Sequence, residues 1–103
     1  MDPNEVKTQL TAIRDNLPLH YSQNSARNLM SSFENYKRVT QTLGNNYSSL
    51  LSGVQSEFSD IEFDIKWAMN GTPKKEAESR FSEAKRHIKD DINSILAILV
   101  TER

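Results

Sequence analysis

The chain has 103 residues, of which 36% are hydrophobic and 26% charged, and its net charge is −1 at neutral pH. This length predicts one domain, residues 1–103, with a modest core that buries about two-thirds of the unfolded surface. The absence of cysteine excludes disulfides, thiolate metal sites and a cysteine nucleophile, and the near-zero net charge disfavours nucleic acid as a partner.

The first two helices are predicted over about residues 3–17 and 24–43. Asp2 is a suitable N-cap for the first helix, and Pro18 ends it because a residue before proline is disfavoured in the α region. Gly44-Asn45-Asn46 stops the second helix, since glycine and asparagine tolerate the left-handed C-cap conformation. The two apolar stripes are Val6, Leu10, Ile13 and Leu17, then Ala26, Leu29, Met30, Phe33, Tyr36, Thr40 and Leu43.

The third and fourth helices are predicted over about residues 47–69 and 73–101. Asn70-Gly71 is a strong turn signal between them. Thr72 is a suitable N-cap for the fourth helix, and Pro73 suits its first position. The two apolar stripes are Leu50, Leu51, Val54, Phe58, Ile61, Ile65 and Ala68, then Ala77, Phe81, Ala84, Ile88, Ile92, Ile95 and Leu99.

Four amphipathic helices joined by short connections predict an all-α, four-helix up-down bundle. Residues 1–5 lack the basic and apolar regions of a cleavable signal peptide, and the longest apolar run, residues 95–100, is too short to cross a bilayer. We therefore expect a soluble, cytoplasmic protein with no membrane span. Export without a cleaved signal peptide stays open.

The third helix carries apolar residues on two faces. At about 100° per residue, Phe63 and Trp67 fall nearly opposite the apolar stripe of that helix. One interpretation is a central helix that its neighbours, or the connection at residues 18–21, cover from both sides. The other is an exposed aromatic patch that binds another protein or a second copy, with Asp60 and Lys66 at its rim.

Carboxylates on the third and fourth helices offer an alternative function. Glu57 and Asp60, with Asp91 on the fourth helix, could hold Mg²⁺ beside a phosphate, as in all-α metal-dependent nucleotide hydrolases. However, the carboxylates of the third helix fan around it rather than converging, namely Glu57, Asp60, Glu62 and Asp64. The sequence also has no glycine-rich or basic phosphate cradle. We therefore predict a solvated acidic face, with no metal site and no cofactor.

On the fourth helix Glu83, His87 and Asp91 follow one another at i,i+4 spacing, next to Glu76 and Arg80. Such a run can form half of a metal site, but it is more typical of an exposed ladder of charge pairs. Basic residues near it are interleaved with acidic ones, and no helix-turn-helix signature precedes them. We expect neither nucleophilic catalysis nor dedicated nucleic-acid binding.

The general character of the chain resembles the small helical proteins that accompany type VII secretion substrates. In that family a Trp-x-Gly turn joins two long helices. The nearest equivalent here is Trp67-Ala68-Met69-Asn70-Gly71, which has two extra residues and lies well past mid-chain. The resemblance implies that this chain is a small helical partner of a type VII secretion substrate. It assigns no role to any residue.

The sequence thus predicts a non-enzymatic protein–protein interaction module, such as an adaptor, chaperone, inhibitor or immunity-type protein. Its predicted partner-binding residues are Phe63, Trp67, Asp60 and Lys66. The partner is another protein or a second copy of the chain, and the catalytic and metal sites are predicted to be absent.

Overall fold

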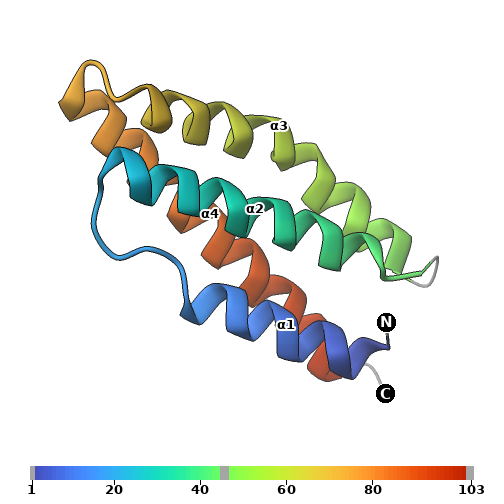
Figure 1. Cartoon of the computed structure of the whole chain (residues 1–103). Helices are drawn as coiled ribbons and strands as arrows, with labels where there is room; N and C mark the ends of the chain where they lie inside the picture. Colours follow the sequence, from blue (N-terminus) through green and yellow to red (C-terminus); the bar gives the residue numbers. More distant parts are fainter. Residues whose placement is uncertain (1, 45–46, 102–103) are drawn as a thin grey trace.

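The computed structural model describes residues 2–44 and 47–101. Within them lie four helices: α1 (Pro3–Asp15), α2 (Gln23–Gln41), α3 (Ser48–Asn70) and α4 (Lys74–Thr101). Successive helices run in opposite directions, and the start of α1 lies at the same end of the bundle as the end of α4 (Figure 1). The predicted all-α, four-helix up-down bundle is confirmed.

The helices are arranged so that α1 and α3 lie on opposite sides of the bundle. Each of them packs against α2 and α4, and within the described residues they do not contact one another. The molecule is flattened as a result, with extents of 46 × 23 × 17 Å. Because α3 has helical neighbours on one side only, it is not the central helix that one interpretation of its two apolar faces required (Figure 1).

The helix ends depend on local capping, and the predicted bounds hold to within two residues. The Asp2 carboxylate caps α1, accepting a hydrogen bond from the backbone N–H of Glu5 at 3.0 Å. α1 ends at Asp15, two residues before Leu17, and its C-cap Asn16 leaves helical geometry at φ −110° and ψ 14°, with its N–H shared between the carbonyls of Ala12 and Ile13. Gly71, at φ 77°, ends α3 in the left-handed conformation that the turn signal predicted.

Two of the predicted helix ends differ in detail. α4 begins at Lys74, one residue later than expected, and the carbonyl of Pro73 accepts its first hydrogen bond, from the N–H of Ala77 at 2.9 Å. Thr72 is therefore not the N-cap. α2 ends at Gln41, three residues before Gly44 of the predicted stop. The other two residues of that stop, Asn45 and Asn46, lie outside the described residues.

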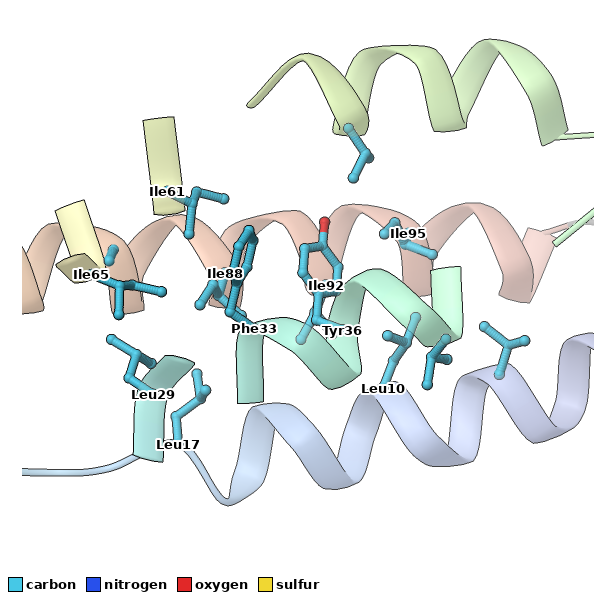
Figure 2. Packing of buried hydrophobic residues seen from close by; sticks show 14 of the residues in the cluster. Leu10, Leu17, Leu29, Phe33, Tyr36, Ile61, Ile65, Ile88, Ile92 and Ile95 are labelled. Carbon is cyan, nitrogen blue, oxygen red and sulfur yellow. The ribbon is translucent and has the colours of Figure 1, made fainter. Parts of the chain in front are cut away.

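The core is built mainly from the predicted stripes of the four helices, to which α2 adds Val39, a buried residue outside its predicted stripe. Each predicted stripe position of α4 is buried, whereas Leu50, Leu51 and Phe58 of α3 are only partly buried. Phe33 and Tyr36 project from α2 beside the α4 isoleucines (Figure 2). Both rings meet Phe58 edge to face, with centroids 5.8 and 5.6 Å apart. These aromatic contacts join α2 to α3 near the middle of the bundle.

The connection between α1 and α2 is fastened to the α3–α4 hairpin by hydrogen bonds. Lys85 Nζ donates to the carbonyls of Pro18 and Leu19, at 3.0 and 3.1 Å. Tyr21 Oη donates to the carbonyl of Ala68 at 2.9 Å. The side chain of Leu19 projects outward and is 79% exposed. The connection therefore closes one end of the bundle without covering the middle of α3.

Among the helices of the described residues, none is both long and apolar enough to cross a membrane.

Truncating one buried and one exposed leucine should measure the contribution of the core. Leu29 is fully buried and Leu19 is 79% exposed, so the chemical change is the same while the surroundings differ. We expect Leu29→Ala to lower the free energy of unfolding by about 2–5 kcal/mol and Leu19→Ala to change it by less than about 0.5 kcal/mol. Urea unfolding followed by circular dichroism measures both. Equal losses would contradict the core described above.

Candidate partner-binding face of α3

The predicted site residues lie together on the side of α3 that points away from the bundle. We call this side the outer face, and it comprises Ser52, Ser56, Ser59, Asp60, Phe63, Lys66, Trp67 and Asn70. All of these residues are exposed except Trp67, which is partly buried. The core stripe residues Ile61, Ile65 and Ala68 of the same helix are fully buried.

An aromatic pair stands at the centre of the outer face. Phe63 is 55% exposed, which makes it, with Leu19, one of two large hydrophobic side chains exposed in the described part of the chain. Phe63 and Trp67 line a shallow depression together with Lys66 and Asn70. Asp60 lies one helical turn before Phe63 and outside this lining. The structure thus brings three of the four predicted residues into direct proximity.

Arg80 of α4 holds the aromatic pair in place, a role that the sequence interpretation missed. Its guanidinium carbon lies 5.3 Å from the ring centroid of Phe63 and 5.5 Å from that of Trp67, within the range of cation–π attraction. Its Nη1 donates to Asp64 Oδ1 at 2.8 Å, and its Nη2 lies 3.6 Å from Glu76 Oε1. Two carboxylates therefore fix the cation, and the cation positions both rings.

Asp64 is not part of a solvated acidic face, so that prediction is wrong for this residue. It is only 8% exposed, at the seam between α3 and α4. Burial of a carboxylate is unfavourable unless a cation and hydrogen bonds compensate it, and Arg80 supplies both. The hydrogen bond with Asp64 is also the main cause that raises the pKa of Arg80. The pair links the two helices directly beneath the aromatic rings.

A second polar cluster joins three helices further along the same seam. Tyr36 Oη of α2 donates to Asp91 Oδ2 of α4 at 3.5 Å, and Glu57 of α3 shares a hydrogen bond with Asp91. Burial, followed by the proximity of Glu57, raises the pKa of Asp91 to about 7. Burial, followed by the negative charge of Asp91, raises the pKa of Tyr36. Asp91 is therefore a half-buried group whose carboxyl holds its proton to a higher pH than an exposed aspartate, and its predicted place in an exposed charge ladder is wrong.

Of the residues in the predicted ladder, Glu76 and Arg80 form a charge pair at 3.6 Å, and Glu83 pairs with Arg86, which the prediction did not include. Arg86 pairs with Glu83 and, at 3.1 Å, with Asp90. His87 is half-buried, and its Nδ1 has no hydrogen-bond partner among the described residues. The ladder therefore consists of arginine–carboxylate pairs and does not continue through Asp91.

The carboxylates proposed for a metal site are only partly brought together. Glu57 and Asp91 contact one another, whereas Asp60 is exposed on the outer face. In residues 2–44 and 47–101 no group of three or more histidine, aspartate or glutamate side chains is placed to hold a metal ion. What the arrangement can do chemically is share a proton between two carboxyl groups.

Comparison of the chain with protein-family models, curated proteins and solved structures finds no match.

Removing Arg80 should both destabilise the chain and loosen the aromatic pair. Arg80→Ala leaves the buried Asp64 carboxylate without its cation and takes the guanidinium away from both rings. We expect a lower melting temperature by circular dichroism and a lower fluorescence anisotropy of Trp67, the single tryptophan of the chain.

Arg86→Ala is the matched control, because Arg86 lies on the same helix and its carboxylate partners are exposed. It should leave the melting temperature and the anisotropy nearly unchanged. Adding Asp64→Ala to Arg80→Ala should recover part of the lost stability, since no unpaired buried charge then remains. If the two arginine variants melt alike, Arg80 does not have the structural role assigned to it.

The raised pKa of Asp91 predicts a specific pH dependence of stability. The folded chain holds this proton up to about pH 7, whereas an unfolded aspartate loses it near 3.8. Because the folded state binds more protons between these values, the contribution of Asp91 to the free energy of unfolding falls as the pH rises through this window and is level above it.

Asp91→Asn should remove that fall, because asparagine stays neutral and can still accept a hydrogen bond from Tyr36. Relative to the unsubstituted chain, the variant should gain stability progressively between about pH 4 and pH 7 in urea unfolding. Asp90→Asn, at the exposed neighbour, is the control and should show no such gain. A pH-independent difference for Asp91→Asn would disprove the shared proton.

Proposed function

We propose that the chain is a non-enzymatic protein–protein interaction module that binds its partner through the outer face of α3. Phe63 and Trp67 form the centre of the contact, and Asp60 and Lys66 lie at its rim. The observation that carries the proposal is the exposure of Phe63, 55%, on a helix that packs against its neighbours only on the other side.

The support for this proposal is energetic. Aromatic side chains dominate the binding energy of protein interfaces, because they bury a large area and lose little conformational entropy. Arg80 already restricts both rings in the free chain. A partner therefore has to order fewer groups on binding, and less of the interaction energy is lost to that ordering.

A metal-dependent hydrolase, the alternative from the sequence, has less support. Of its three proposed ligands only Glu57 and Asp91 are in contact, whereas Asp60 lies exposed on the outer face. Partner binding through the outer face does not depend on the contact between Glu57 and Asp91. We therefore propose binding, without catalysis, as the function.

Affinity capture with matched variants tests this function. The immobilised chain and its Leu19→Ala control should retain the same partner, since Leu19 is exposed but lies on the α1–α2 connection and is not part of the outer face. Phe63→Ala and Trp67→Ala should weaken that binding by roughly 30-fold or more, the loss typical of a hot-spot aromatic. All variants should keep the same helix content by circular dichroism. Equal retention by Phe63→Ala and by the control would refute the assignment of the face.

A further inference from the structure

We propose that the partner bound by the outer face is a second copy of this chain, with two α3 helices packed antiparallel about a two-fold axis at Phe63. The proposal rests on the proposed function and names its partner. A two-fold interface requires a surface that is complementary to itself, so that each feature meets its counterpart from the other copy. The outer face satisfies this requirement in its charges and in its side-chain sizes.

The charges on the outer face are arranged symmetrically and with opposite sign around Phe63. Asp60 stands three residues before Phe63 and Lys66 three residues after it, and both are exposed. Neither forms an ion pair with another of the described residues. A two-fold axis at Phe63 brings Lys66 of each copy to the level of Asp60 in the other. Two unpaired charges per chain then become two attractive pairs across the interface.

Side-chain size along the outer face is also complementary under the same rotation. The half before Phe63 presents small residues, Ser52, Ser56 and Ser59, and the half after it presents Trp67 and Asn70. In the antiparallel arrangement Trp67 of one copy lies at the level of Ser59 in the other. Large side chains then meet small ones, which allows the two helices to approach closely.

Two details of the small half fit a close approach by another helix. The hydroxyl of Ser56 donates back to the carbonyl of Gly53 at 2.7 Å, so it lies against its own helix. A Cβ added at Gly53 would meet no atom within 4 Å, so no packing inside the chain calls for a glycine there. This glycine adjoins the outer face, where a second copy would come near it.

A parallel pair of α3 helices is excluded by the same features. It would place Asp60 level with Asp60 of the other copy and Lys66 level with Lys66, so that like charges meet twice. It would also place Trp67 level with Trp67 and leave the serine half unfilled. Because few large apolar groups lie on the outer face, the antiparallel dimer is weak and forms in the micromolar range or above.

Charge reversal tests both the dimer and its direction, with oligomeric mass measured by sedimentation velocity from low micromolar to millimolar concentration. The unsubstituted chain should pass from monomer to dimer, and Phe63→Ala should stay monomeric. Asp60→Lys alone, or Lys66→Asp alone, turns both interface pairs into like charges and should weaken the dimer about tenfold or more. The combined Asp60→Lys and Lys66→Asp variant exchanges the two charges and should restore it.

Lys89→Asp, a reversal at an exposed position of α4, is the matched control and should dimerise like the unsubstituted chain. A chain that stays monomeric up to millimolar concentration overturns the proposal, as does a dimer that survives Phe63→Ala or one that the combined reversal fails to restore. The proposed function stands separately if the monomeric chain still captures another protein in a Phe63-dependent way. It falls as well if neither dimerisation nor capture depends on Phe63.

Discussion

The apolar stripe of α4 is the constraint on which the rest of the structure depends, because α4 is the longest of the described helices, contacts the other three and buries every position of its predicted stripe. Ile88, Ile92 and Ile95 follow one another along this stripe beside the aromatic rings of α2 (Figure 2). With α4 and α2 in contact, α1 occupies one side of the pair and α3 the other. The outward orientation of one face of α3 is a consequence of this arrangement.

The polar residues that border the α4 stripe determine the properties of the site. Arg80 reaches α3 near the hairpin and meets a buried carboxylate, and the same guanidinium holds two aromatic rings at the surface. Asp91 reaches α3 about three turns later and meets a second carboxyl group, where burial favours its neutral form. The first contact makes the aromatic face rigid, and the second makes the helix seam sensitive to pH. Both follow from one helix lying against another with charged groups at the edge of the contact.

Part of the site could be predicted from periodicity alone. The angular positions of Phe63 and Trp67 on their helix depend only on the rotation per residue, which is a local property. The partner of Asp64 could not be found in the same way, because Arg80 is 16 residues distant and the contact depends on how the two helices are rotated and displaced. For the same reason the acidic residues of α3 looked alike in the sequence. Packing against α4 then buried Asp64 and left Asp60 in solvent.

The amino-acid sequence by itself determined the number of helices, their ends to within two residues, the turn at Gly71 and the apolar stripes. These features arise from capping and from side-chain spacing, whose energies act within a few residues of the chain. The tertiary structure decided that α3 lies at the side of the bundle, that Arg80 fixes the aromatic pair and that the pKa of Asp91 is raised. Those outcomes depend on desolvation and on contacts between helices, which have no local signature because the partners are distant in the sequence.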